Sequence, residues 1–195
     1  MTQTDDESRG PSGGGSLAPF RIAIIMTGGT IAKTYDQRLA TMRNAETVVE
    51  HLVGPLRLVN TKVIFNDLMR KDSLDLDAAD RVLIVNTVLS AAKANDAVIV
   101  IHGTDTLAET GEALFAAAPN PPVPLVLTGA MVPSVVGGSD GLQNITEALF
   151  ACKLLTPGVY AVFHGRALAF PGVIKDRAAM TLIHSTQSSL REERL

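Results

Sequence analysis

Hydroxyl and carboxylate side chains gather in one short stretch of the chain, HGTDT, between His102 and Thr106. The residues before it, 97–101, are apolar and mostly β-branched, which is typical of a strand buried on both faces. A helical spacing of apolar residues starts at Leu107. Ligands bind where strands end and helices begin in open α/β sheets, so this stretch is a candidate site. The alternative is that Thr106 and Glu109 only form a capping box for the helix.

Hydroxyl side chains also follow other expected strands. The set consists of Thr30, Ser73, Thr104 and Thr128. A hydroxyl is a poor nucleophile unless a base removes its proton, and a desolvated lysine can be that base. Backbone N–H groups at glycine turns can stabilise an oxyanion. These parts suit acyl transfer or amide hydrolysis that needs no metal and no cofactor.

Other kinds of site find little support in the chain. A dinucleotide site needs G-x-G-x-x-G before a helix, but Gly28 and Gly29 are adjacent and residues 32–44 lack a helical stripe. This makes the dinucleotide site the weakest alternative. We expect residues 32–44 to form a hairpin or a mobile loop that carries Tyr35. A tyrosine in a polar loop is usually only a surface residue, which is the alternative to a functional role. The sequence has no G-x-S-x-G elbow and no metal-ligand cluster, because its histidines are isolated from Cys152 and from one another.

Apolar strands alternate with helical patterns along the chain. This alternation predicts an α/β domain of three layers, flavodoxin-like or Rossmann-like, in which helices flank a mainly parallel sheet. The expected strands cover 21–26, 97–101, 124–127 and 158–163, with 167–170 as a hairpin partner, and a further strand lies within 57–68. The expected helices cover 45–52, the residues from about 76 to 92, 107–118 and 142–152.

Local polar residues are candidate caps for these helices. Ser73 and Asp75 can each cap the second helix, and that role is an alternative to ligand binding for both. Asp140 with Gln143 can cap the last helix. The final segment, 173–195, shows no strong period. A lysine such as Lys175 near a chain end is normally a solvated charge.

Composition indicates one domain with an aliphatic core. The chain of 195 residues is 46% hydrophobic but only 4% aromatic, and it has no tryptophan. A net charge of −3 gives no reason to expect nucleic acid or an acidic membrane as partner, and no apolar run approaches a membrane span. Cys152 stands alone and is expected to be a small buried hydrophobe in a reducing compartment.

The first 19 residues are rich in Gly, Ser, Pro and charge. We expect residues 1–19 to be a disordered tail and the fold to begin at Phe20. No basic region followed by an apolar stretch is present at the start, so we expect no secretory signal and a cytoplasmic protein.

Two motifs in this order resemble the signatures of the bacterial-type L-asparaginases: TGGTIA at 27–32 and HGTDT at 102–106. Further blocks agree with the resemblance. DSLD at 72–75 resembles the family's substrate-binding segment, LTGAMVP at 127–133 followed by Asp140-Gly141 resembles its third block, and Lys175 stands where the family carries its catalytic lysine. The similarity runs from about Phe20 to at least Lys175.

The resemblance implies a reaction and a set of catalytic residues. The family hydrolyses L-asparagine to L-aspartate and ammonia, often with some activity on L-glutamine, and uses two threonine-centred triads. Thr30 is then the candidate nucleophile with Tyr35 beside it. Thr104, Asp105 and Lys175 form the second triad, which activates water. Asp105 would also pair with the substrate α-ammonium.

The same resemblance implies how the substrate is held. Ser73 would bind the α-carboxylate through its hydroxyl and backbone N–H groups, and Ala130 would offer its backbone carbonyl to the amide. Leu74 stands where the family often has Gln, so one side-chain contact differs. The implied substrate-binding residues are Gly29, Ser73, Leu74, Asp75, Gly103 and Ala130, with no metal and no cofactor.

Length is where the chain departs from the common family pattern. Many members carry a second, C-terminal domain, which in the oligomer sends an acidic residue into a neighbouring site. Residues 20–195 correspond to the N-terminal domain and resemble the short, single-domain asparaginases. We therefore expect a homo-oligomer, with a tetramer favoured, in which the acid is absent or comes from another subunit.

Two other classes of function stay open. One is a non-catalytic amino-acid-binding or regulatory domain, or an inactive fragment. The other is the amidase component of a tRNA-dependent amidotransferase assembly, although the mild acidity and the lack of a basic stripe argue against direct contact with tRNA.

Overall fold

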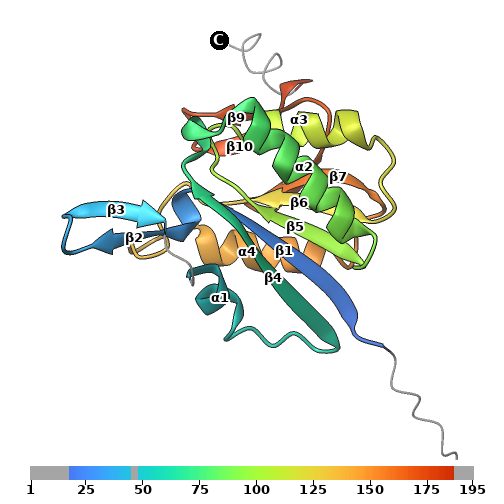
Figure 1. Ribbon diagram of the computed structural model, residues 1–195, viewed down its shortest axis with the longest axis horizontal. Coiled ribbons are helices and arrows are strands. Elements are labelled where there is room, and N and C mark those ends of the chain that lie inside the picture. The colour runs from blue at the N-terminus through green and yellow to red at the C-terminus, as the bar shows by residue number, and fades with distance from the viewer. Residues whose placement is uncertain (1–17, 45–47, 187–195) are drawn as a thin grey trace, which may run out of the picture.

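A six-stranded sheet forms the centre of the computed structural model, which describes residues 18–44 and 48–186 (Figure 1). Its strands, in spatial order, are β4 (Thr61–Lys71), β1 (Phe20–Gly28), β5 (Ala97–Ile101), β6 (Pro124–Thr128), β7 (Gly158–Phe163) and β8 (Arg166–Ala169). The first five are parallel, and β8 returns antiparallel to β7. Counted along the chain, the parallel strands have the order 2-1-3-4-5 of flavodoxin-like sheets.

Helices cover both faces of the sheet, which confirms the predicted fold class (Figure 1). One face packs against α2 (Ala78–Ala92) and α3 (Leu107–Ala117), and the other against α1 (Val48–Val53) and α4 (Gly141–Ala151). Side chains alternate between the faces along β1, so that Ile22 and Ile24 lie on the α1/α4 side and Ile25 on the α2/α3 side. Cys152, which directly follows α4 as its C-cap, is buried, as expected, and burial raises the pKa of its thiol to about 12.

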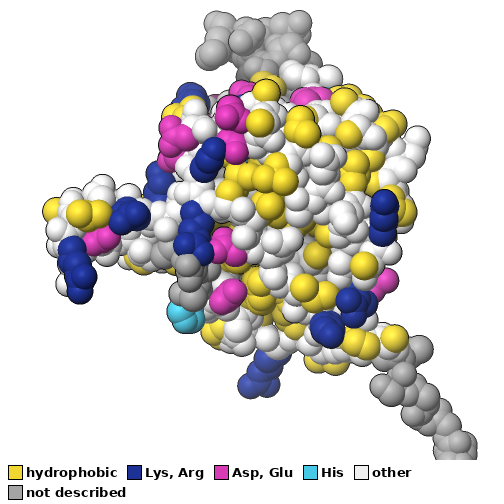
Figure 2. All heavy atoms as spheres, in the orientation of Figure 1, with side chains coloured by type: hydrophobic (Ala, Val, Ile, Leu, Met, Phe, Trp, Pro, Cys, Tyr) yellow, Lys and Arg dark blue, Asp and Glu magenta, His cyan; other side chains and the backbone are white. Residues whose placement is uncertain are grey.

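Two small antiparallel hairpins stand outside the main sheet. The first pairs β2 (Lys33–Asp36) with β3 (Thr41–Asn44), which confirms a hairpin within 32–44. It projects from the body, and dark blue basic side chains lie on it in Figure 2. The second pairs β9 (Val173–Asp176) with β10 (Thr181–His184). The sequence did not reveal this second hairpin, because residues 173–195 show no strong period of apolar and polar residues.

The caps of α2 differ from those expected. Asp77 caps this helix, and its carboxylate and that of Asp80 reciprocally accept the other's backbone N–H. The expected caps, Ser73 and Asp75, lie earlier in the 3₁₀ turn η2 (Ser73–Asp75). The prediction of a cap at either residue was therefore wrong.

Two further expected caps occupy the right positions but bond elsewhere. Thr106 stands at the N-cap of α3, yet its hydroxyl donates to the Ser73 carbonyl at 2.8 Å instead of closing a capping box. Asp140 stands at the N-cap of α4, yet its carboxylate accepts the N–H groups of Met131 and Val132. Partners from distant segments have displaced the local ones in both cases.

Two predicted segments fall outside the described residues. This applies to nearly all of the predicted tail, 1–19, and to the first three residues of the predicted helix, 45–47. Within the described part, no helix is long and apolar enough to cross a bilayer. In the same part, no group of three or more His, Cys, Asp or Glu side chains is arranged to hold a metal ion.

Candidate active site

The turns after β1, β5 and β4 pack against one another at the carboxyl edge of the sheet. A Cβ on Gly29 would lie 2.5 Å from the Gly103 Cα, and a Cβ on Gly103 would lie 2.6 Å from the Ser73 Oγ. Gly29 also has φ +89°, a conformation that favours glycine. These turns meet where the strand order reverses between β1 and β5, the usual ligand crevice of such sheets.

A lysine reaches the hydroxyl stretch from the β9–β10 hairpin. The Lys175 Nζ donates to the Thr104 Oγ1 at 2.8 Å and to the Asp105 Oδ1 at 3.1 Å. Thr104 is buried, and Lys175 and Asp105 are mostly buried. The structure thus brings together three of the residues that the sequence analysis singled out, from segments about 70 positions apart.

Helix α3 holds this hairpin in place. The Gly172 N–H donates to the Glu112 carboxylate at 2.6 Å, just before β9 begins. The Phe170 ring lies directly over Gly111, since a Cβ there would be 1.9 Å from the ring Cζ. The absence of a side chain at Gly111 therefore lets the chain approach α3 closely before it turns into β9.

Thr30 and Tyr35 occupy different environments. Thr30 follows Gly29 directly, at the start of the 3₁₀ turn η1 (Thr30–Ala32), and its hydroxyl has no hydrogen-bond partner among the described residues. Tyr35 lies on the projecting β2–β3 hairpin and is 56% exposed. Within the part of the chain that the structure describes, no hydrogen bond joins Tyr35 to Thr30.

The η2 turn combines one buried and two exposed residues. Ser73 is buried and its Oγ has no hydrogen-bond partner in the described structure, an arrangement that leaves a donor available beside Gly103. Leu74 is 68% exposed, and Asp75 is also exposed. Lys33 anchors this turn to the β2–β3 hairpin through the Asp72 carboxylate at 2.7 Å, and this contact holds the pKa of Asp72 below its usual value.

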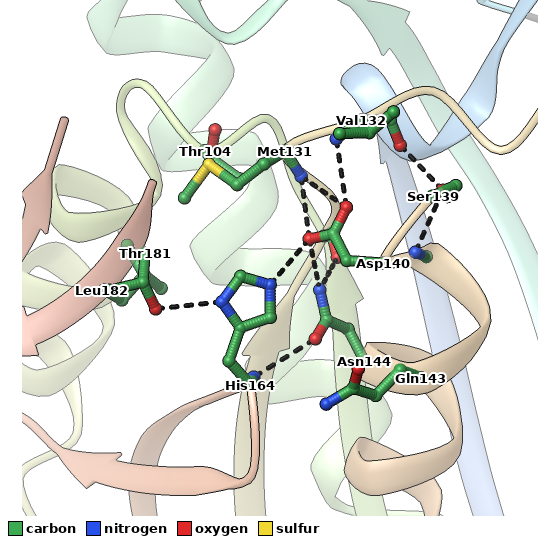
Figure 3. A network of polar contacts seen from close by, with 12 residues as sticks. Thr104, Met131, Val132, Ser139, Asp140, Gln143, Asn144, His164, Thr181 and Leu182 are labelled. Carbon is green, nitrogen blue, oxygen red and sulfur yellow. Dashed lines mark hydrogen bonds and ion pairs between the residues drawn. The ribbon is translucent and has the colours of Figure 1, made fainter. Parts of the chain in front are cut away.

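The turn of residues 129–132, which follows β6, lies against the HGTDT stretch. A Cβ on Gly129 would lie 2.3 Å from the His102 carbonyl oxygen, and Ala130 is fully buried. Asp140 holds the turn from the other side through the N–H groups of Met131 and Val132 (Figure 3). Burial by itself raises the pKa of the Asp140 carboxyl, but these N–H groups and His164 together keep it below its usual value.

His102 shapes the stretch without being placed for proton transfer. Its ring is fully buried, with Nδ1 2.8 Å from the Gly103 carbonyl and Nε2 2.8 Å from the Thr110 Oγ1. Burial lowers the pKa of His102 to about 4, so the ring is neutral at pH 7. A carbonyl can only accept, so the proton resides on Nδ1 and Thr110 donates to Nε2.

Sequence reasoning missed two contributors to the site. Arg177, in the turn of the β9–β10 hairpin, places its Nη2 2.8 Å from the Asp105 Oδ1. His164 connects Asp140 with Thr181 (Figure 3). No local signal reveals Arg177, because its segment lacks a period. For His164, the only hint in the sequence was its partner Asp140, and Asp140 is equally suited to capping a helix.

The chain is similar to proteins of one family. A family model described as "Asparaginase, N-terminal" matches residues 21–187. An L-asparaginase from Thermococcus kodakarensis is 34% identical over 144 residues, and a glutamyl-tRNA(Gln) amidotransferase chain from Methanosphaera stadtmanae is 32% identical over 149 residues. Each alignment covers 74% of this chain, but only 44% and 33% of those proteins, respectively.

The chain is also similar to solved structures of L-asparaginases. The thermostable L-asparaginase from Thermococcus kodakarensis superposes with a TM-score of 0.72 at 32% identity, covering 80% of this chain and 48% of that one. L-asparaginase I from Vibrio cholerae superposes with a TM-score of 0.70 at 26% identity, covering 86% and 52%. The chain thus spans about half the length of these two asparaginases.

Proposed function

The chain belongs to the asparaginase family, and we propose that its site hydrolyses the side-chain amide of L-asparagine to L-aspartate and ammonia, with minor activity on L-glutamine. The observation that carries this proposal is the contact of the Lys175 Nζ with the Thr104 Oγ1 at 2.8 Å, beside Asp105. An ammonium group held between a hydroxyl and a carboxylate is suited to controlling the protonation of that hydroxyl.

In the proposed reaction, Thr30 is the nucleophile. Its oxygen forms a bond to the amide carbon, its proton is transferred to the leaving nitrogen, and the C–N bond breaks to release ammonia. Water hydrolyses the resulting acyl-enzyme and regenerates the Thr30 hydroxyl. Thr104 and Lys175 activate that water, while Tyr35 acts on Thr30 from the β2–β3 hairpin. The hydroxyl of Thr30, without a partner among the described residues, is available for this chemistry.

The substrate is held by the turns at the carboxyl edge. Ser73 binds the α-carboxylate with its unpartnered hydroxyl, and Asp105 pairs with the α-ammonium. Ala130 accepts a hydrogen bond from the amide through its backbone carbonyl. The remaining contacts come from Gly29, Leu74, Asp75 and Gly103.

The proposal is tested by measuring ammonia release from L-asparagine. Thr30→Ala, Thr104→Val and Lys175→Met should each lower kcat by at least about a hundredfold, the effect of losing one positioned acid–base group. Two matched controls should keep normal turnover. Thr146→Val lies on the exposed side of α4. Lys153→Met lies just after α4, where the lysine contacts Thr61 at the start of β4. Near-normal turnover by a site variant would remove that residue from its role.

A second candidate function is the amidase part of a tRNA-dependent amidotransferase. It is favoured by the 32% identity to the amidotransferase chain of Methanosphaera stadtmanae. Preferential release of ammonia from L-glutamine, together with a partner chain that co-purifies, would support this function over the first. Efficient turnover of L-asparagine by the isolated protein would exclude it as the main activity.

We further propose that the protein is a homo-oligomer, with a tetramer favoured, in the cytoplasm. Phe150 and Leu154 on the α4 side are 65% and 66% exposed, and exposed apolar patches of this kind suit contact between subunits. The lone buried Cys152 suits a reducing compartment. The mass in solution tests the oligomer, and a fully active monomer would contradict it.

A further inference from the structure

We propose that His164 is a positioning residue that fixes Lys175 relative to the Ala130 carbonyl, by tying the β9–β10 hairpin to the 129–132 turn. The inference rests on the proposed function for the roles of Lys175 and Ala130. The ties themselves are observed contacts within the polar network of Figure 3.

The 129–132 turn is held by side chains of α4 and its cap. The two carboxylate oxygens of Asp140 accept the N–H groups of Met131 and Val132 at 2.9 to 3.0 Å. Asn144, fully buried, donates from its Nδ2 to the Gly129 carbonyl and to the Asp140 carboxylate, both at 2.9 Å. The backbone on both sides of Ala130 is therefore fixed by two side chains.

The β9–β10 hairpin is held at Thr181 and Leu182. Arg166 donates from its Nη2 to the Thr181 Oγ1 and to the Leu182 carbonyl, both at 2.9 Å. Leu182 lies opposite Lys175 in the register of the hairpin. A shift of β10 at this point therefore moves the backbone that carries the lysine.

His164 joins these two groups. Its Nε2 lies 3.0 Å from the Asp140 Oδ2, and its Nδ1 lies 3.0 Å from the Thr181 Oγ1. Its own N–H donates to the Asn144 Oδ1 at 3.1 Å. Asp140 can only accept, so Nε2 is the donor there. Both ring nitrogens and the backbone of one residue thus link the two segments.

The backbone conformation of His164 adds to the specificity of this link. His164 has φ +50°, in the left-handed region, where non-glycine residues are uncommon. This conformation sits in the turn between β7 and β8. The direction of the ring toward Asp140 and Thr181 is therefore set by the turn as well as by its hydrogen bonds.

The consequence for the reaction is geometric. Lys175 meets Thr104 from the hairpin, whereas Ala130 approaches from β6, and the main sheet does not contain the hairpin. A misplacement of about 1 Å at a reacting group can cost a hundredfold in rate. The link through His164 keeps the lysine and the amide-binding carbonyl at one spacing.

The test uses kinetics of the full chain with L-asparagine. His164→Ala and Thr181→Val should each lower kcat by about tenfold to a hundredfold while KM changes little. The loss of kcat in the double variant should be clearly smaller than the product of the two single losses, because both changes break the same contact between His164 and Thr181. Thr181→Val also removes the acceptor of one Arg166 hydrogen bond, so a small further loss beyond His164→Ala is expected. His164→Gln, which restores a donor and an acceptor at similar reach, should recover most of the lost kcat.

Matched controls are His51→Ala, on the exposed surface of α1, and Thr146→Val, and both should leave kcat unchanged. An unchanged kcat in the link variants, or losses that multiply in the double variant, would overturn the proposal. Thr181→Val removes a single hydroxyl, so it carries the test even where His164→Ala fails to fold.

Hydrogen exchange separates this proposal from the proposed function. In Thr181→Val, the amides of Met131 and Val132 and those of β10 should exchange faster together. Faster exchange in β10 alone would overturn the link. A wild-type protein that releases no ammonia from any amide would refute the proposed function, and the exchange result would still decide the role of His164.

Discussion

Acid should destabilise this protein through His102 by an amount that the structure predicts. Burial lowers the pKa of His102 from 6.5 to about 4 in the folded state. The unfolded chain therefore binds more protons than the folded one as pH falls between these values, so the free energy of unfolding decreases across this window. One pKa unit corresponds to 1.36 kcal/mol, which makes the total loss about 3 kcal/mol, complete below about pH 4.

The measurement compares urea unfolding of the wild type and His102→Gln near neutral pH and at about pH 4. Glutamine keeps an amide donor and acceptor near Gly103 and Thr110 but does not titrate. The variant should be less stable by about 1–3 kcal/mol near neutral pH, because its hydrogen bonds fit less well. This difference should shrink in acid and reach zero or reverse. Carboxyl groups such as Asp140 are common to both proteins and cancel.

A stability difference that stays constant with pH would refute this reasoning. So would a ring proton resonance of His102 that titrates near the ordinary pKa of histidine, because burial would then not exclude the charged form.

Two glycine substitutions test the packing around the site. Gly29→Ala should abolish ammonia release and lower the free energy of unfolding by more than about 1 kcal/mol, because the new Cβ would lie 2.5 Å from the Gly103 backbone at a positive φ. Gly137→Ala, which has nothing within 4 Å, is its control, and equal activity in the two variants would contradict the packing described. Gly111→Ala should lower the thermal midpoint, since overpacking against the Phe170 ring costs about 1–3 kcal/mol and exceeds the gain in helix propensity. A rise in the midpoint would show that the ring moves aside freely.

The central sheet could be predicted because its signals are local. Residues 97–101 form an unbroken apolar run, and the structure buries all of β5. The hydroxyl stretch after it follows directly in the chain. The meeting of Lys175 with Thr104 was implied by resemblance to a family and by no spacing in the sequence, since it depends on a hairpin held by α3.

The misassigned caps show what local reasoning lacks. Thr106 and Asp140 carry the right side chains at the right helix positions, and both bond to distant backbone groups instead. The sequence offers both kinds of partner, and only the tertiary arrangement decides between them. The same applies to Arg177 and His164, whose partners lie in other segments.

Two residues of the site, Thr104 and Lys175, extend from parts of the fold that differ in size and burial. Thr104 extends from a strand buried within the main sheet, whereas Lys175 extends from a separate two-stranded unit. Such small units open more readily than a sheet interior. Transient detachment of the hairpin would withdraw the ammonium group while the rest of the architecture stays folded. The proposed activity should therefore be lost at a lower temperature or denaturant concentration than the one at which the main sheet unfolds.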